Sequence, residues 1–489
     1  MENKNEALTD INAHMETKGH KGRVFLIYPP SPVMNREDRC QQPTDDLIVI
    51  PPLPPSDLMY LASVAREAGF EPKIKDYSLK NETIEDLIKD IKEFQPDYLV
   101  LNAATPTLNS DLAPLETVKR GFPNIKTVAK GAHFNILAKE TLEKFSALDI
   151  AIMGEAELTL KDILSGLPLS EIQGVTYRTT DGTIAENPKR PFNEDLDALP
   201  YPARDLIDNN FYKRPDTGEL QAVIKVSRGC PFHCFFCLAT PVSGAKVRYR
   251  SPEDILGEIK ECYEKFGIKN FIFWSDIFNL NKEWVHSLCN AIINSGMKIT
   301  FSTNSRADTA DEDTVDLMKK AGCSLVSIGI ESGSQYMLDK MGKKITLDDI
   351  KNTVKLFKKK GIKVYAYYVL GLPWESEETA RETIEFSKKL NTHFVSYYTA
   401  TALCGSRFYD YVKEHNLGEL NYDLPYFYPS VNTHHLSKER VFEIHKNAVR
   451  GYYIRPRYIL MMLFQIRTFA EFKNYFKAGL RVLFRNKKH

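Results

Sequence analysis

Short apolar runs alternate with amphipathic helical stretches over the first third of the chain. The runs end in loops that are rich in proline, glycine, serine and threonine. Strands that alternate with helices of about three turns predict βαβ units and a parallel, doubly wound α/β sheet. The predicted strands are 24–28, 73–76, 98–102, 127–129 and 150–153, and the predicted helices are 58–68, 83–94, 112–120 and 137–145. A sheet of this kind binds ligands beyond the carboxyl ends of its strands.

A second βα series begins at Ala222. It follows a TTDGT turn at 179–183, which predicts a hairpin, and an extended linker rich in proline and aspartate. The predicted strands are 222–227, 270–274, 298–303, 325–330, 363–370 and 394–399, and the predicted helices are 252–266, 282–295, 312–321, 347–360 and 376–390. Six strands and five helices are too few for a closed eight-fold barrel, so the pattern predicts an open, partial (β/α)6 barrel.

These patterns divide the chain into five parts. They are a disordered tail (1–22), a doubly wound domain (23–165), a linker with a hairpin (166–215), a barrel (216–410) and a mostly helical C-terminal region (411–489). The tail lacks the apolar core of a signal peptide, and no stretch of about 18 uncharged apolar residues occurs, so we expect a cytoplasmic protein.

Composition excludes several classes of protein. With 43% hydrophobic and 26% charged residues, the chain is neither disordered nor collagenous. A net charge of +1 gives no bulk attraction to nucleic acid. Eight cysteines in 489 residues are too sparse for a disulfide scaffold, and three of them lie within eight residues. The cysteines therefore favour a metal or cluster site.

The three clustered cysteines are Cys230, Cys234 and Cys237, directly after the first strand of the second series. The spacing C-x3-C-x2-C can hold three irons of a [4Fe–4S] cluster, which leaves the fourth iron open to a small molecule. A zinc site completed by His233 is the alternative, although this histidine lies awkwardly between two ligands. Unrelated buried thiols are a second alternative. The other cysteines, Cys40, Cys262, Cys289, Cys323 and Cys404, are predicted not to be ligands.

This motif resembles that of the radical S-adenosylmethionine (SAM) superfamily. The resemblance continues in FWSDIF (273–278), STNSR (302–306), GIESG (329–333) and LGLP (370–373), each at the predicted carboxyl end of a strand. It implies that SAM is bound by Asp276, Ser302, Arg306, Glu331, Ser332 and Gly371. Other roles stay open: Arg306 can pair with a neighbouring carboxylate, Glu331 can be an exposed loop carboxylate, and Gly371 can be a turn glycine.

The first domain is similar to the cobalamin-binding domain of the B12-dependent branch of that superfamily. The loops that carry this similarity are 28–32, 102–111, 130–135 and 153–157. The residues it implies for cobalamin are Pro29, Ser31, Thr105, Thr107, Asn109, Gly131, His133, Gly154 and Glu155. Many such domains carry Asp-x-His-x-x-Gly after the second strand, whereas this chain has Ser78 in place of the histidine. We therefore expect base-off cobalamin without a histidine ligand; a domain that has lost cobalamin is the alternative.

The resemblance implies a methyltransferase that acts on an unactivated carbon. One SAM would methylate cobalamin, and a second would give the 5′-deoxyadenosyl radical, with electrons from a donor such as flavodoxin or ferredoxin. The alternative is a cobalamin radical SAM cyclase, as in anaerobic tetrapyrrole ring formation. A methylthiotransferase is disfavoured because only Cys40 precedes the cluster motif.

The C-terminal segment 446–489 has eleven Lys/Arg against one acid, Glu471. Phe469, Phe472, Phe476, Leu480, Leu483 and Phe484 recur in it at helical spacing. A basic amphipathic helix with aromatic anchors predicts contact with an anionic membrane at its inner face, and favours a lipid-like or other small-molecule substrate. Packing against the barrel is the alternative, and nucleic acid is disfavoured.

Overall fold

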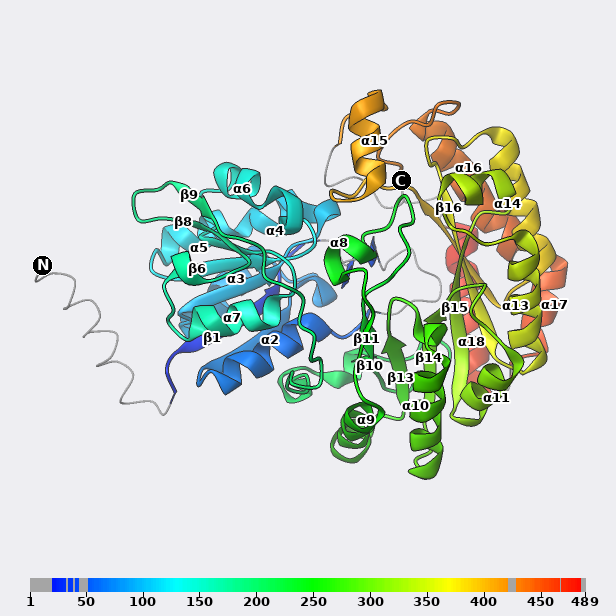
Figure 1. Ribbon diagram of the computed structural model, residues 1–489, viewed down its shortest axis with the longest axis horizontal. Coiled ribbons are helices and arrows are strands. Elements are labelled where there is room, and N and C mark those ends of the chain that lie inside the picture. The colour runs from blue at the N-terminus through cyan, green and yellow to red at the C-terminus, as the bar shows by residue number, and fades with distance from the viewer. Residues whose placement is uncertain are drawn as a thin grey trace, which may run out of the picture. The chain divides into compact units, whose positions relative to one another are not determined.

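The computed structural model describes residues 20–31, 34–37, 40–43, 52–420, 428–466 and 468–484. The chain divides into two compact units, each with its own sheet (Figure 1). Unit 1 comprises the described parts of 1–42, 55–193 and 198–208, and unit 2 those of 43–54, 194–197 and 209–489. Both units are of the α/β class, as the alternation of strands and helices predicted.

Unit 1 contains a seven-stranded sheet in the order β4-β1-β5-β6-β7-β8-β9. Its strands are β1 (Arg23–Tyr28), β4 (Glu71–Asp76), β5 (Tyr98–Asn102), β6 (Lys126–Lys130), β7 (Ile150–Ile152), β8 (Val175–Arg178) and β9 (Ile184–Glu186). The first five are parallel, and β8 and β9 add antiparallel to the edge at β7. The predicted hairpin thus forms, and it extends the first sheet rather than lying in a free linker.

The unit 1 helices are α2 (Ser56–Glu67), α3 (Ile84–Phe94), α4 (Leu108–Leu112), α5 (Pro114–Gly121), α6 (Phe134–Lys144) and α7 (Ala156–Leu164). The predicted helix 112–120 is wrong at its start, because Pro114 fits only the first turn of a helix and begins a separate α5. The sequence pattern missed α7. A small sheet of β2 (Met34–Glu37) and β3 (Cys40–Pro43) completes the unit.

Unit 2 contains six strands that are parallel and adjacent in chain order. They are β10 (Gln221–Lys225), β13 (Asn270–Trp274), β14 (Thr300–Ser305), β15 (Cys323–Glu331), β16 (Lys363–Leu370) and β17 (Phe394–Thr399). This confirms the open, partial barrel. The prediction for β14 is wrong by two residues at each end, so that Ser302 lies inside the strand and not at its end.

The outer face of this sheet is covered by α9 (Pro252–Phe266), α10 (Lys282–Asn294), α11 (Glu312–Lys320), α13 (Leu347–Lys359) and α14 (Glu377–Leu390) (Figure 1). Each of these five helices begins at a polar residue whose side chain accepts the backbone N–H three residues later. The short elements α8 (Ala239–Ser243), α12 (Gln335–Lys340), β11 (Ser227–Arg228) and β12 (Arg248–Tyr249) were not predicted. These caps and short elements lie in the loops that connect the strands, where the cluster motif also falls.

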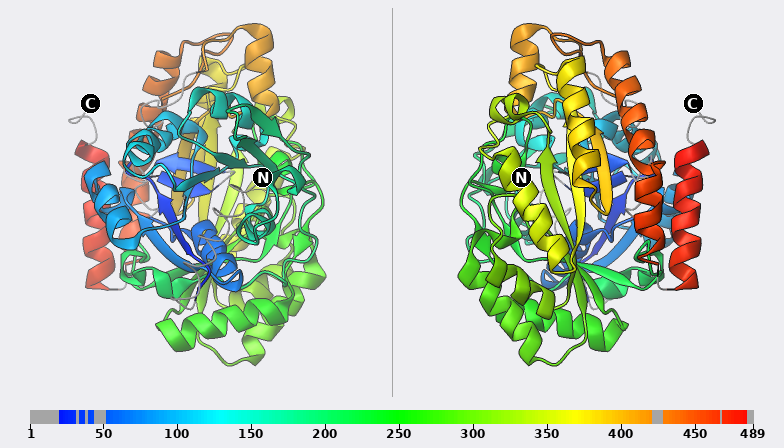
Figure 2. Two further views of the ribbon diagram at one scale, coloured as in Figure 1. Left: turned by 90° about the vertical axis from the view of Figure 1, so that its left-hand side faces the viewer. Right: turned by 90° about the vertical axis from the view of Figure 1, so that its right-hand side faces the viewer.

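The C-terminal region is helical, as predicted. It contains α15 (Arg407–His415), α16 (Lys438–Tyr453), α17 (Pro456–Leu463) and α18 (Phe469–Phe484). Helix α16 packs against β17 and α14, and α18 packs in turn against α16. Both views of Figure 2 show α18 (red) alongside the orange-red helices before it. Across the part of the chain that the structure describes, no helix is long and apolar enough to cross a membrane.

Candidate functional site

The loop that carries Cys230, Cys234 and Cys237 runs from β11 to α8, beyond the carboxyl end of β10. It begins at Gly229, which has φ +104°, and a Cβ there would lie 2.1 Å from the carbonyl oxygen of Lys246. Only glycine fits this close approach. The Gly229 N–H donates to Oδ2 of Asp276 at 2.8 Å, and the Cys230 N–H donates to the Gly244 carbonyl at 2.9 Å. Asp276, predicted to contact SAM, therefore holds the start of the cysteine loop.

The three thiols differ in exposure, because Cys230 is buried while Cys234 and Cys237 are half-buried. The Ala239 N–H donates to Sγ of Cys237 at 3.3 Å. Among the described residues, no three His, Cys, Asp or Glu side chains are gathered as ligands of one ion would be. The loop thus carries three thiols on eight residues, and thiolates of this number on one loop are typical ligands of a [4Fe–4S] cluster.

Arg306, at the end of β14, braces this loop from the side. Its guanidinium lies 3.6 Å from the ring centroid of Phe232, a residue that stands between the first two motif cysteines in the sequence. It also donates to both carboxylate oxygens of Asp308, at 2.9 and 3.0 Å, and to the Lys343 carbonyl at 2.8 Å. The structure thus shows the pairing with a neighbouring carboxylate, and it gives Arg306 a role in positioning the loop.

Glu331, the last residue of β15, forms a buried ion pair with Lys343. The Oε1 and Nζ atoms are 2.7 Å apart, and the side chains are 10% and 8% exposed. Burial would lower the pKa of Lys343, but the charges of Glu331 and then Cys234 outweigh it, so this pKa is raised. A Cβ on Gly329 would lie 2.3 Å from Oε1 of Glu331. Glu331 is therefore not an exposed loop carboxylate, and Lys343 is a site residue that the sequence did not reveal.

The remaining residues predicted to bind SAM are Ser302, Ser332 and Gly371. The Ser332 hydroxyl shares a 2.8 Å hydrogen bond with the Thr383 hydroxyl of α14. Gly371 has φ +90°, and a Cβ there would lie 2.8 Å from Cγ1 of Val441 on α16. Ser302 lies in mid-strand, because β14 continues to Ser305. Ser332 and Gly371 thus contact the helices α14 and α16 that pack beside the strands.

In unit 1 a buried polar network lies at the carboxyl ends of β1, β5 and β6. Its centre is Asp57 of α2, which accepts hydrogen bonds from the Tyr28 hydroxyl at 2.6 Å, from Lys130 Nζ at 3.1 Å and from Asn102. The three donors come from three adjacent parallel strands. A buried carboxylate is stable only when it is paired and hydrogen-bonded in this way. None of these four was predicted as a cobalamin residue, although Tyr28, Asn102 and Lys130 begin three of the loops that carry the similarity.

A second buried ion pair joins two of the predicted loops. Arg36 Nη1 lies 2.5 Å from Oδ2 of Asp111, and both side chains are fully buried. Arg36 also donates to the hydroxyls of Ser31 and Thr107, at 2.5 and 3.3 Å. The loops after β1 and β5, which carry these two predicted residues, are therefore held together by one guanidinium.

The other predicted cobalamin residues have mixed positions along the same edge. Pro29 and Thr105 are buried, and Gly131 has φ +143°. Asn109 accepts a hydrogen bond from Lys144 at 2.8 Å, and Glu155 accepts one from the Asn193 N–H at 2.8 Å. The Gly154 N–H donates to Asn135 at 2.6 Å. His133 is 1% exposed, and its Nε2 lies 3.2 Å from the Thr141 hydroxyl. Burial lowers the pKa of His133 to about 4, so its ring is neutral at physiological pH.

Comparison with known families finds two domains in this chain. The B12 binding domain matches residues 51–164, and the Radical SAM superfamily matches residues 224–387. The fold and the two sites define a radical SAM enzyme with an N-terminal cobalamin domain. The chain belongs to the cobalamin-binding branch of the radical SAM superfamily, and its relatives include methyltransferases.

Three similar proteins illustrate this. An uncharacterized methyltransferase of Pyrococcus horikoshii is 31% identical over 437 residues, which cover 88% of this chain and 94% of the relative. The anaerobic magnesium-protoporphyrin IX monomethyl ester cyclase of Rubrivivax gelatinosus is 26% identical over 348 residues, with 69% and 62% covered. The structure of the cobalamin-dependent SAM radical enzyme OxsB, with aqua-cobalamin and SAM bound, has a TM-score of 0.73 and 16% identity, with 93% and 70% covered. The last likeness shows the shared fold.

Proposed function

We propose that this radical SAM enzyme is a cobalamin-dependent C-methyltransferase that acts on an unactivated carbon of a lipid-like or other small biosynthetic intermediate. The observation that carries the proposal is the match to an uncharacterized methyltransferase, which covers 88% of this chain and 94% of that relative. The cyclase match covers only 62% of its own length. A cyclase, without net methyl transfer, is the second candidate because that match still covers 69% of this chain.

The site residues have distinct tasks in this proposal. Cys230, Cys234 and Cys237 would ligate a [4Fe–4S] cluster that binds SAM at its open iron. When bound, these groups supply a radical that abstracts hydrogen, and cobalamin supplies the methyl group. The chain itself holds the cysteine loop through Asp276 and Arg306, which restricts the motion of the three ligands.

The cobalamin edge of unit 1 supports a corrinoid without a histidine ligand. Ser78, which stands where many cobalamin domains have histidine, donates to Asp76 at 2.6 Å. His133 is buried and its Nε2 contacts the Thr141 hydroxyl, so reaching a cobalt ion would break its packing. Both observations favour base-off cobalamin. The buried pairs of Asp57 with Lys130 and of Arg36 with Asp111 would keep the binding loops rigid.

The test is turnover under anaerobic conditions after reconstitution with iron, sulfide and cobalamin. The protein is incubated with flavodoxin and its reductase as electron donor, methyl-deuterated SAM, and either a lipid extract or an aqueous metabolite extract. We expect both 5′-deoxyadenosine and S-adenosylhomocysteine, and a deuteriomethylated product in the lipid extract. A methylated product from the aqueous extract only would overturn the lipid-like substrate but not the proposed methyl transfer. Release of 5′-deoxyadenosine without any methylated product would favour the cyclase.

A further inference from the structure

An apolar cavity of about 300 Å³ lies in unit 2 at the amino ends of the barrel strands. Phe394, at the start of β17, forms one wall, and Tyr458 and Met462 of α17 form another. Phe472 and Phe476 of α18 close the outer side. The cysteine loop lies at the opposite, carboxyl end of the strands. Neither proposed cofactor site accounts for this cavity.

The cavity opens onto an exposed apolar face of α17, α18 and the turn between them. The exposed side chains of this face, called here the α17–α18 face, are Ile459, Leu460, Leu463, Phe464, Phe469, Phe472, Phe476 and Leu480. Phe464 and Phe469 are 88% and 81% exposed. Several others, such as Phe476, both line the cavity and reach the surface. Monomeric proteins seldom expose so many large apolar groups together unless the patch binds something.

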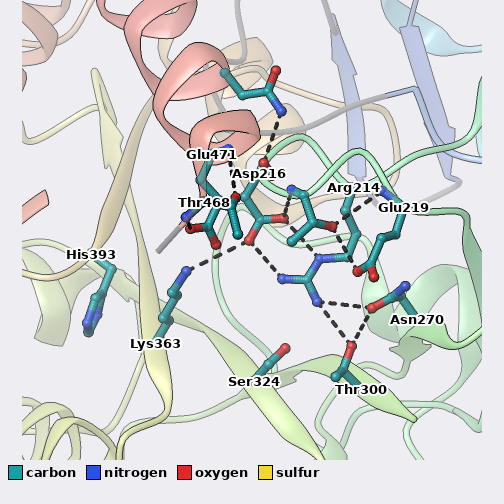
Figure 3. Close-up of polar contacts among 12 residues, drawn as sticks. Arg214, Asp216, Glu219, Asn270, Thr300, Ser324, Lys363, His393, Thr468 and Glu471 are labelled. Carbon is teal, nitrogen blue, oxygen red and sulfur yellow. Dashed lines mark hydrogen bonds and ion pairs between the residues drawn. The ribbon is translucent and has the colours of Figure 1, made fainter. Parts of the chain in front are cut away.

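Helix α18 is fixed to the barrel by its inner side (Figure 3). Asn474 donates to the Asp216 carbonyl at 2.9 Å, and the Tyr475 ring stacks on Phe394 with centroids 6.4 Å apart. Asp216 is itself held by Arg214, through two hydrogen bonds of 2.9 and 2.8 Å. The helix is thus packed on the barrel with one side, while its phenylalanine side faces outward. Of the two sequence-based alternatives, packing on the barrel holds for the inner side of this helix, and the phenylalanines of its other side are exposed.

The sequence of this region is basic, because segment 456–484 contains five Lys/Arg and one acid, Glu471. Three of these basic residues are exposed. Lys473 and Lys477 each follow an exposed phenylalanine by one position, and Arg457 is exposed on α17. Lysine side chains so placed keep their ammonium groups in water or at phosphates while the neighbouring rings enter an apolar phase. An acidic surface with an apolar interior complements this combination.

We propose that the α17–α18 face docks on an anionic phospholipid bilayer, with an acyl chain entering the cavity. The exposed rings would lie at the boundary between headgroups and acyl chains, with the basic residues near the phosphates. Strand β16 has eight residues, so about 26 Å separates this end of the barrel from the catalytic end. The cavity is therefore an anchoring site and not the substrate pocket, and the inference does not depend on the proposed reaction.

The test is co-sedimentation of the full chain with vesicles of phosphatidylcholine alone or mixed equally with phosphatidylglycerol. We expect binding to the anionic vesicles at low salt and partial release at high salt, because salt screens charge. Phe464→Ser with Phe469→Ser should weaken binding about tenfold, since both rings are exposed and neither lines the cavity. Leu167→Ser with Tyr336→Ser, at exposed apolar positions elsewhere, is the matched control and should bind as the unaltered chain does.

Insertion is measured separately with Phe476→Trp at the cavity mouth. The unaltered chain has three tryptophans, so its spectrum is subtracted from that of the variant. The remaining fluorescence should shift to the blue and be quenched by lipids that carry a nitroxide on the acyl chain. Unchanged circular dichroism and uncoupled SAM cleavage show that each variant is folded. Failure of the unaltered chain to bind anionic vesicles would overturn the proposal. Dimerisation through this face would also overturn it. The unaltered chain would then be a dimer, and the Phe464→Ser, Phe469→Ser variant would be a monomer.

Discussion

Lys343 and Glu331 form a buried ion pair, with 2.7 Å between Nζ and Oε1, beside the loop of the motif cysteines. The backbone near Lys343 is bonded directly to the cysteine loop, because the Phe235 N–H donates to the Met341 carbonyl at 2.9 Å. The charge of Cys234, after that of Glu331, is among the causes that raise the pKa of Lys343. The salt bridge and this backbone hydrogen bond together link the end of β15 to the cluster loop. We therefore expect the ion pair to affect both the stability of unit 2 and the properties of the cluster.

Lys343→Met should destabilise unit 2 and lower the reduction potential of the cluster. The variant leaves Glu331 buried without its partner, which costs about 3–5 kcal/mol. Removing a cation near a cluster thiolate disfavours the added electron. Unfolding in urea and a redox titration followed by electron paramagnetic resonance measure the two effects. Glu331→Gln with Lys343→Met should recover most of both, because no lone buried charge remains; equal potentials in all three proteins would contradict this account.

Replacement of Cys230, Cys234 and Cys237 by alanine should abolish the cluster and SAM cleavage. Iron and sulfide analysis after anaerobic reconstitution measures the first effect, and 5′-deoxyadenosine release measures the second. Cys323→Ala is the matched control, because this thiol is 1% exposed within the apolar core of the barrel. It should keep full iron content. A triple variant that retained its iron would exclude these cysteines as the ligands.

Glu375 should make unit 2 less stable as the pH rises from about 4.5 to about 7. It is 1% exposed, and burial raises its pKa from 4.5 to about 7. Between these values the unfolded chain releases the proton while the folded chain retains it. Stability is therefore full below the unfolded pKa and falls by on the order of 3 kcal/mol as the pH passes the folded pKa.

The three tryptophans, Trp274, Trp284 and Trp374, all lie in unit 2, so their fluorescence during urea unfolding follows this unit alone. Glu375→Gln should keep the hydrogen bond with Thr379. It should remove the fall in the free energy of unfolding between pH 4.5 and about 7, the two pKa values of Glu375. The same slope in the unaltered protein and the variant would show that another group is responsible.

Much of the fold was predictable because its signals are local. Strands β13, β16 and β17 coincide with the predicted runs, since each is a β-branched and aromatic stretch between clear breaks. The end of β14 was missed because its residues are polar. In the structure Asn304 donates to the Ser275 carbonyl at 3.1 Å and Ser305 donates to Asn279 at 3.0 Å, so tertiary partners extend the strand.

The polar networks were not predictable for a related reason. Asp111 is 75 residues from Arg36, and Lys130 is 73 residues from Asp57. No periodicity or spacing indicates which distant charge will meet which. The cluster motif was found because its three thiols are close in sequence, whereas the residues that support it, such as Lys343, come from later loops. The chemistry of the site was readable, but its supporting contacts required the folded chain.

His133→Gln should bind cobalamin as the unaltered protein does. In the structure Nε2 of His133 lies 3.2 Å from the Thr141 hydroxyl, and the ring is 1% exposed, so it is engaged in packing at the start of α6. Glutamine can replace this hydrogen bond with little change in volume. The reduced, cobalt(II) form of both proteins should show no splitting from a histidine nitrogen in electron paramagnetic resonance. Asp57→Ala, by contrast, should weaken corrinoid binding, because it leaves Lys130 buried without its carboxylate at the carboxyl edge of the sheet. A nitrogen splitting that is present in the unaltered protein and lost in His133→Gln would establish a histidine ligand and overturn the base-off proposal.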